Sequence, residues 1–255
     1  MKTTFSSPQV VVFDDVLPPE QFQQLWRYMQ SVPYKHVHAE GVRGVWRPED
    51  GNPMEGPRTV NLAITPPEEM VEGMMAAYPG TSLYPTHKPI DPLLEAVKAL
   101  ATEHQAMLGQ GGEDWLLFSA APWIYPTGSG LSWHCDDGKL YTGAFIYYAH
   151  PEWNVQWGGE LLIADESAKG AGKLGDEGGT GPRRQHVFDN KEENEQLLRG
   201  NGLGTFIIPR PNRLVFLARD YPHMVAKVSP AAGNRVRASV AGFFIRPEFL
   251  FGGGQ

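Results

Sequence analysis

The 255-residue sequence has very little cysteine, no long apolar run and no excess of positive charge. Its single cysteine, Cys135, excludes an internal disulfide framework and any cysteine-based zinc cluster. The first residues lack the apolar segment of a signal peptide, and no run is apolar for long enough to cross a bilayer. These absences predict a cytoplasmic protein without a membrane partner, in which any metal ligands are His and carboxylate side chains.

Acidic residues outnumber basic ones, 29 to 22, which gives a formal net charge of −7. A general nucleic-acid binder neutralises phosphates with an excess of Lys and Arg, so this balance argues against a nucleic-acid partner. The hydrophobic content of 41% and charged content of 20% are those of an ordinary globular protein. We expect a single domain over residues 1–255.

Predicted helices come first in the chain, and predicted strands dominate later. The N-terminal support, residues 1–112, has a β-branched strand at 9–13, short strands at 34–38 and 43–47, and helical periodicity at 19–31, 68–78 and 91–108. The core, residues 113–247, has strand-like runs at 116–125, 131–134, 141–148, 158–164, 205–209, 213–217, 221–228 and 235–245. Because strands and helices do not alternate, this order predicts an α+β, mainly β fold. We expect an antiparallel double-stranded β-helix, a cupin-like jelly roll, with helices packed outside it.

One long segment, residues 165–204, interrupts the strand pattern and is rich in glycine and charge. Connections of this length inside a compact domain are functional loops or disordered segments. We interpret it as an inserted loop that covers the functional site, with disorder as the alternative.

The tripeptide His134-Cys135-Asp136 is the centre of the chemical signal. On an extended strand, side chains at positions i and i+2 lie on one face, so His134 and Asp136 converge while Cys135 points away. An imidazole and a carboxylate on one face supply two thirds of a 2-His-1-carboxylate iron site. Such a pair also arises by chance at strand ends, so it needs a third ligand; His223 is the candidate.

Three polar residues alternate on the last predicted strand: Arg235, Arg237 and Ser239. They would share one face of an otherwise apolar strand. A buried arginine requires an anionic partner, and guanidinium suits bidentate binding of a carboxylate. The alternative, that one or both arginines point to solvent, remains open.

Several motifs extend this signal in chain order. They are Tyr125, Gly128-Ser-Gly130, His134-x-Asp136, Gly158-Gly159-Glu160-Leu161, Asn212-Arg213-Leu-Val-Phe216, His223-x-Val225, Gly233-x-Arg235-x-Arg237-x-Ser239 and Gly242-Phe243. As an ordered set they resemble the prolyl-4-hydroxylase-like branch of iron(II)/2-oxoglutarate-dependent dioxygenases. The resemblance covers about residues 115–247, with a looser match of the N-terminal strand and helix.

The resemblance implies that His134, Asp136 and His223 bind Fe(II) and that Tyr125 hydrogen-bonds the co-substrate 2-oxoglutarate. Halogenating relatives have a small residue where Asp136 stands, so hydroxylation or another oxidation is expected rather than chlorination. Ascorbate is a candidate reductant.

The basic residue for the distal carboxylate of 2-oxoglutarate is ambiguous. Arg237 followed by Ser239 fits the family's Arg-x-Ser spacing, whereas Arg235 fits its Gly-x-Arg spacing. We favour Arg237 with Ser239 and keep Arg235 as a competitor. Many prolyl hydroxylases carry Lys there, so the arginine separates this chain from the collagen-type enzymes.

The implied reaction couples dioxygen and 2-oxoglutarate to oxidation of an unactivated C–H bond, with release of succinate and carbon dioxide. We expect a small polar substrate, such as an amino acid or natural-product intermediate, with Trp46, Arg47 and Arg58 as candidates for its rim. The alternatives are a prolyl or other protein side-chain hydroxylase, and a cupin-like metal-binding sensor without oxygenase activity. A further alternative is that the three ligand candidates are unconnected. The sequence leaves open whether the protein is a monomer or a homodimer.

Overall fold

The computed structural model describes residues 1–39, 46–65, 71–72, 80–136, 139–169, 197–198 and 200–247. Although residues 71–72 are described and helical, most of the helix expected at 68–78 and most of the segment at 165–204 therefore lie outside the described residues. So do residues 43–45 of the second short strand, and the described Trp46 and Arg47 are not in a strand. No helix of the described residues is long and apolar enough to cross a membrane.

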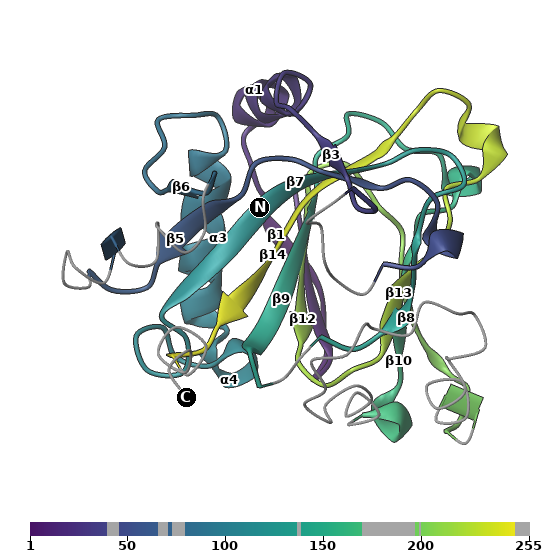
Figure 1. Ribbon diagram of the computed structural model, residues 1–255. Helices are drawn as coiled ribbons and strands as arrows, with labels where there is room; N and C mark the ends of the chain where they lie inside the picture. Colours follow the sequence, from purple (N-terminus) through teal and green to yellow (C-terminus); the bar gives the residue numbers. More distant parts are fainter. Residues whose placement is uncertain are drawn as a thin grey trace.

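Two sheets, antiparallel except where β6 joins β5, form the jelly roll (Figure 1). The main path of the ten-stranded sheet is, in spatial order, β1 (Lys2–Ser6), β2 (Val10–Asp14), β12 (Arg213–Ala218), β9 (Tyr141–Tyr148), β14 (Arg237–Ile245), β7 (Leu117–Tyr125), β4 (Met54–Glu55) and β3 (Lys35–His36). Two further strands branch from β7, namely β5 (Thr59–Leu62) and then β6 (Ser82–Leu83). The four-stranded sheet has the order β11 (Gly204–Ile207), β10 (Leu161–Ala164), β13 (His223–Val225) and β8 (Leu131–His134). The mainly β, jelly-roll prediction is confirmed.

The larger sheet separates two apolar cores. Its outer face packs on helices α1 (Pro19–Met29) and α3 (Asp91–Glu103), through residues such as Phe118 and Phe244 that are fully buried. Figure 1 shows α3 on the side of this sheet away from β8, β10 and β13. The inner face packs on the smaller sheet through a second apolar cluster. Strand alternation therefore sends every second side chain of β9 and β14 into the space between the sheets.

The helix expected at 91–108 is interrupted at His104. Helix α3 ends there, and a short helix α4 (Gln105–Leu108) follows. The backbone of His104 is not helical (φ −114°, ψ 29°), and its ring packs edge-on against Phe13. The periodicity prediction was wrong at this residue, whose ring Nδ1 also lies 3.0 Å from the carbonyl oxygen of Leu100.

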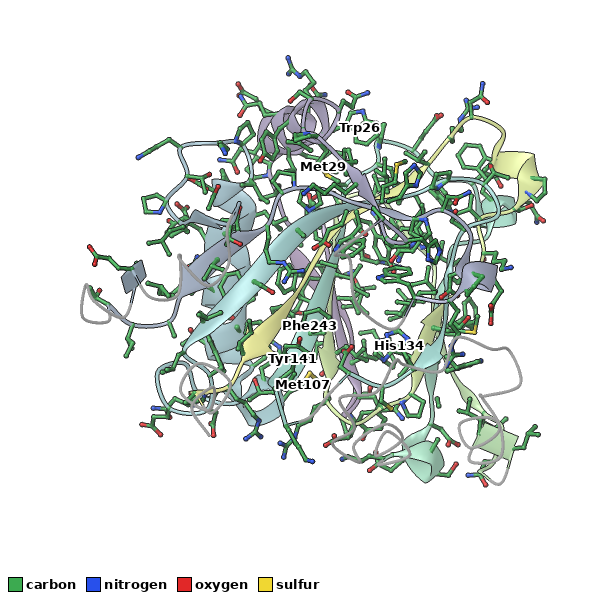
Figure 2. All side chains as sticks on the ribbon, in the orientation of Figure 1. Trp26, Met29, Met107, His134, Tyr141 and Phe243 are labelled. Atoms are coloured by element: carbon green, nitrogen blue, oxygen red, sulfur yellow. The ribbon has the colours of Figure 1, made fainter. Side chains whose placement is uncertain are left out.

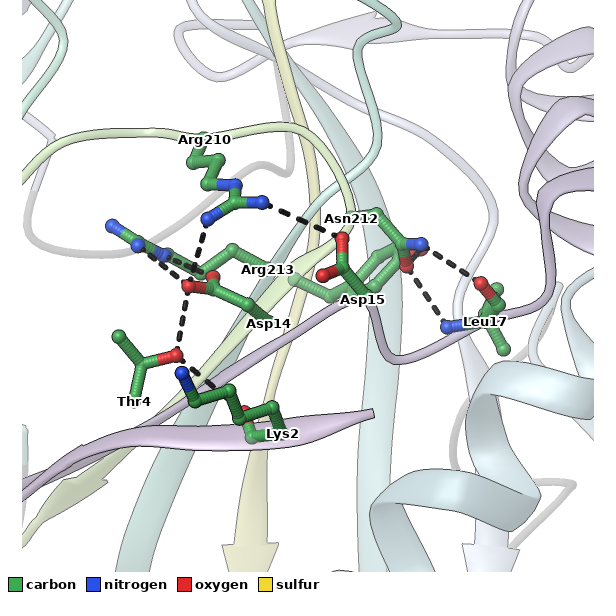
Figure 3. A network of polar contacts seen from close by, with 9 residues as sticks. Lys2, Thr4, Asp14, Asp15, Leu17, Arg210, Asn212 and Arg213 are labelled. Atoms are coloured by element: carbon green, nitrogen blue, oxygen red, sulfur yellow. Dashed lines mark hydrogen bonds and ion pairs between the residues drawn. The ribbon is translucent and has the colours of Figure 1, made fainter.

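A buried carboxylate, Asp14, joins the first two strands to the connection before β12 (Figure 3). It accepts hydrogen bonds from Arg213 at 2.7 and 3.0 Å, from Thr4 at 2.8 Å and from Arg210 at 3.2 Å. Burial alone would raise the pKa of Asp14, but these hydrogen bonds and the charges of the two arginines outweigh it and lower the pKa below the ordinary value of 3.8.

We predict that Asp14→Asn lowers the free energy of unfolding at pH 7 by about 2 kcal/mol, because charge-assisted hydrogen bonds are lost. The folded-state pKa is depressed, so the stabilisation is present above about pH 4 and is lost as the pH falls through the folded pKa. Urea unfolding of both proteins should therefore show a difference that narrows below pH 4. Arg210→Gln, at a half-exposed side chain, is the control with a smaller effect. If the difference in the free energy of unfolding between the wild type and Asp14→Asn stays constant with pH, this role for Asp14 is contradicted.

Candidate metal and co-substrate site

The three ligand candidates converge at one end of the smaller sheet. His134 and His223 are direct cross-strand partners on β8 and β13, with ring centroids 4.2 Å apart. Asp136 completes a triangle: its oxygens lie 3.8 Å from Nε2 of His134 and 3.7 Å from Nε2 of His223. One ligand atom from each residue lies within 4.8 Å of the other two. Divalent metals bind such atoms at about 2.0–2.2 Å, so the triangle has room for one ion.

The backbone fixes which nitrogen of each histidine is free. Nδ1 of His134 lies 2.8 Å from the carbonyl oxygen of Ser132, and Nδ1 of His223 lies 2.9 Å from that of Tyr221. A carbonyl can only accept, so each Nδ1 donates and each neutral ring keeps the Nε2 lone pair for a metal. Metal-binding histidines typically donate their other ring N–H in this way.

Burial acts differently on the histidine and carboxylate ligand candidates. Burial, with a smaller contribution from His223, lowers the pKa of His134 well below its ordinary value and keeps the ring neutral. Burial raises the pKa of Asp136, whereas His223 opposes that shift. A bound cation favours the carboxylate form of Asp136 and so offsets the effect of burial on this side chain. The triangle of ligand atoms therefore suits a divalent metal.

The convergence does not depend on a continuous strand. Strand β8 ends at His134, so Asp136 lies two residues beyond it rather than within it as expected. The carboxylate still turns to the same side as the imidazole. The ligand atoms that converge come from His134, Asp136 and His223, and Cys135 is not one of this group.

The second part of the site is the guanidinium of Arg237, which is almost completely buried at 1% exposure. Its Nε donates to the carbonyl oxygen of Gly159 at 2.8 Å, and its Nη1 lies 3.4 Å from Oγ of Ser239. The group is sandwiched between the rings of Tyr125 and Tyr148, each centroid 4.9 Å from Cζ. Such stacking orients a guanidinium without neutralising its charge.

Two hydrogen-bond donors in this arrangement lack an acceptor among the described residues. Nη2 of Arg237 and the hydroxyl of Tyr148 are buried and have no hydrogen-bond partner among the described residues. Burial raises the pKa values of Tyr125 and Tyr148, with Arg237 acting against it in both, so both phenols stay protonated donors at neutral pH. A buried cation with unpaired donors is costly unless an anion joins it. The arrangement therefore fits a carboxylate ligand.

Glycine at position 159 makes room for this arginine. Its φ is +76°, and a Cβ there would lie 2.9 Å from Cδ of Arg237. At Gly158, also left-handed with φ +70°, a Cβ would lie 2.4 Å from the carbonyl oxygen of Lys227. The Gly158-Gly159 pair is thus required by two close approaches beside the carboxylate site.

The structure separates the two arginines that the sequence could not distinguish. Strand β14 begins at Arg237, so Arg235 precedes it and does not share its face. The side chain of Arg235 is 56% exposed, forms an ion pair with Glu152 at 2.8 Å and lies over the ring of Trp157. Arg235 is thus satisfied at the surface, whereas Arg237 lies inside the jelly roll.

Sequence reasoning missed two residues near the site, Tyr148 and Asp50. Tyr148 pairs with Ser239 across β9 and β14, and the alternation of β9 would have placed it on the inner face. Asp50 is buried and accepts hydrogen bonds from Ser132, which is 82 residues away in the chain. No local pattern reports such a long-range contact.

The two sheets face each other across the site. Figure 2 shows His134 on the smaller sheet and Tyr141 and Phe243 on the larger sheet across from it. Arg237, from the larger sheet, reaches Gly159, which precedes β10 of the smaller sheet. The metal-ligand candidates and Arg237 thus come from the two facing sheets.

Comparisons with known structures agree with this architecture. A prolyl-4-hydroxylase from Pseudomonas putida is similar with a TM-score of 0.55 and 17% identity, covering 93% of each chain. A prolyl hydroxylase from Trichoplax adhaerens, in complex with a hypoxia inducible factor peptide fragment, has a TM-score of 0.58 and 15% identity; the match covers 98% of this chain and 89% of that one. The α-ketoglutarate-dependent epimerase SnoN from nogalamycin biosynthesis has a TM-score of 0.53 and 11% identity, with 93% of this chain and 78% of that one covered. At these identities the likeness shows the fold alone.

Sequence comparison adds the family. A search of curated proteins finds no significant match. The model of the 2OG-Fe(II) oxygenase superfamily matches residues 121–245, a segment that contains His134, Asp136, His223 and Arg237. It includes all strands of the smaller sheet and the neighbouring strands β12, β9 and β14 of the larger sheet. With this match on the jelly roll described above, the chain belongs to the 2OG-Fe(II) oxygenase superfamily, whose members are oxidoreductases that use Fe(II), 2-oxoglutarate and dioxygen.

Proposed function

We propose that this protein is an Fe(II)/2-oxoglutarate-dependent oxygenase that oxidises an unactivated C–H bond of a small molecule. The observation that carries the proposal is the buried guanidinium of Arg237, stacked on the ring of Tyr148. Nη2 of Arg237 and the hydroxyl of Tyr148 have no hydrogen-bond partner in the part of the chain that the structure describes. Together these donors fit the distal carboxylate of 2-oxoglutarate. His134, Asp136 and His223 are the proposed iron ligands.

Each residue has a defined part in the proposed reaction. Bound Fe(II) supplies the activation of dioxygen and the oxidative decarboxylation of 2-oxoglutarate to succinate and carbon dioxide. Arg237 binds the distal carboxylate, while Ser239, Tyr125 and Tyr148 fix its position. The backbone carbonyls of Ser132 and Tyr221 hold the histidine rings in the tautomer that presents Nε2. The surrounding jelly roll limits the access of water.

A protein side-chain hydroxylase is the second candidate. It is favoured by the likeness to the Trichoplax adhaerens prolyl hydroxylase, which was solved with a peptide fragment. The likeness to SnoN, an epimerase of nogalamycin biosynthesis, supports a small-molecule substrate instead. Succinate release stimulated by peptides, and not by small molecules, would favour the protein substrate.

His223→Ala tests the metal site. Because one of three ligands is lost, we expect Fe(II) affinity to fall by about 100-fold or more, since even loss of outer-shell partners costs 10–100-fold. Under anaerobic conditions the wild type with Fe(II) and 2-oxoglutarate should show a visible metal-to-ligand charge-transfer band, and the variant should not. His36→Ala, at an exposed histidine of β3, is the matched control and should keep the band. If the wild type binds iron but shows no charge-transfer band, the result would instead support a cupin-like metal-binding sensor without oxygenase activity.

Arg237→Ala and Arg235→Ala separate the two arginines. Removing the buried guanidinium should weaken 2-oxoglutarate binding by about 100-fold, roughly 3 kcal/mol for a charge-assisted pair. Removing the exposed Arg235 breaks surface contacts with Glu152 and Trp157 and should change affinity by less than about twofold. Titration of the charge-transfer band with 2-oxoglutarate measures both. Equal losses in the two variants would remove Arg237 from its proposed role.

A further inference from the structure

We infer that Asp50, in the N-terminal support, is a positioning residue for His134, one of the three proposed metal ligands. The inference rests on the proposed metal site and adds a buried carboxylate that sets how firmly this site holds its ion. Asp50 ends the short helix η1 (Pro48–Asp50) and is 1% exposed. It is not among the residues whose ligand atoms converge, so it acts on the ion through another residue.

A chain of hydrogen bonds leads from this carboxylate to the imidazole. Oδ1 of Asp50 accepts from the backbone N–H of Ser132 at 2.8 Å and from its hydroxyl at 2.6 Å. The carbonyl oxygen of the same Ser132 accepts from Nδ1 of His134 at 2.8 Å. Ser132 is thus held at two donors while its carbonyl orients the ring. A shift of Ser132 would move the acceptor of the ring N–H, and with it the Nε2 lone pair that faces the proposed ion.

Strand β8 depends on this support because its own pairing is irregular at Ser132. It is the last strand in the order of the smaller sheet, with β13 as its neighbour. The register partners are His134 with His223 and Leu131 with Val225, so two residues of β8 lie opposite one residue of β13. Such a bulge interrupts the ladder of backbone hydrogen bonds. Asp50 supplies an acceptor for the N–H of Ser132 at this interruption, where strand pairing is weakest.

The segment around Asp50 is itself anchored on the turn before β8. Oδ2 of Asp50 accepts from the backbone N–H of Arg47 at 2.8 Å, which closes η1. The backbone carbonyl of Asp50 accepts from the backbone N–H of Gly130 at 2.9 Å. Two residues further on, the backbone N–H of Asn52 donates to Oγ of Ser129 at 3.0 Å. These bonds hold the carboxylate at a fixed distance from β8.

The expected size of the effect follows from what removal of the carboxylate leaves behind. In Asp50→Ala, the N–H and the hydroxyl of Ser132 lose their buried acceptor, and Ser132 can shift or turn to find another. Loss of an outer-shell partner typically lowers metal affinity by about 10–100-fold. Because Asp50 acts on His134 through Ser132 rather than directly, we expect the lower end of that range.

Cobalt(II) titration, read from its visible absorption, tests this role without catalysis. Asp50→Ala should weaken Co(II) binding by about tenfold. Asp50→Asn keeps an amide oxygen for Ser132 but turns an NH₂ group toward the N–H of Arg47. It should therefore recover most of the Co(II) affinity while its melting temperature stays below that of the wild type. This split separates positioning of the ligand from a general loss of stability.

The matched control is Asp14→Ala, at the other buried carboxylate of the N-terminal support. It should lower the melting temperature but leave Co(II) affinity within about twofold, because Asp14 bonds Thr4, Arg210 and Arg213 and not β8. If Asp50→Ala does not fold, Ser132→Ala, which removes only the hydroxyl, carries the test with a smaller expected loss.

The outcomes distinguish the positioning role from the metal site itself. Wild-type Co(II) affinity in the Asp50 and Ser132 variants, or an equal loss of affinity in Asp14→Ala, would overturn the inference and leave the metal site in place. A wild-type protein that binds no Co(II) would overturn the metal site, and the positioning role with it.

Discussion

The burial of a guanidinium that has no counter-charge among the described residues is the constraint on which the site depends. Arg237 is 1% exposed, and its protein partners are a carbonyl oxygen, a hydroxyl and two aromatic faces, none of them anionic. A fold that buries a charge in this way is incomplete without an anion. The surrounding features serve that requirement: Gly159 leaves space for the side chain, and the two tyrosines supply flat walls. An anionic ligand, which we propose is the distal carboxylate of 2-oxoglutarate, would complete the charge balance.

The jelly roll supplies the second requirement, which is to bring distant segments together. The larger sheet contributes Arg237, the proposed carboxylate anchor, and the smaller sheet contributes the two histidines. The N-terminal support adds more than outer packing, since Asp50 reaches the start of β8 and Asp14 ties the first strands to β12 through Arg213. Its two buried carboxylates thus act at different places, one beside the metal candidates and one at the edge of the larger sheet.

The sequence predicted those parts of the structure that repeat locally. The runs at 131–134 and 141–148 coincide with β8 and β9, because β-branched and aromatic residues mark strands. His134 and Asp136 were predicted as ligand candidates from their spacing, and His223 from its frame. Contacts between distant segments could not be predicted from local patterns. Asp50 bonds Ser132, and Arg237 stacks on Tyr148, only in the folded chain. Strand alternation alone predicted that Arg235 and Arg237 share a face. The turn at Gly233 (φ +60°) extends further, because the backbone N–H of Arg235 still donates to the carbonyl oxygen of Ala232. The strand therefore starts only at Arg237.

The direct pairing of His134 with His223 has a consequence for folding. The two histidines are far apart in the chain and share a point only in one alignment of β8 and β13. A slip of one residue between these strands would turn His223 to the opposite face and destroy the triangle. A metal that binds only the correct alignment stabilises it over the slipped one by mass action. The ion would thus also favour the correct register of β8 and β13. Under metal-depleted growth conditions, we expect a larger fraction of chains in which these two strands are out of register.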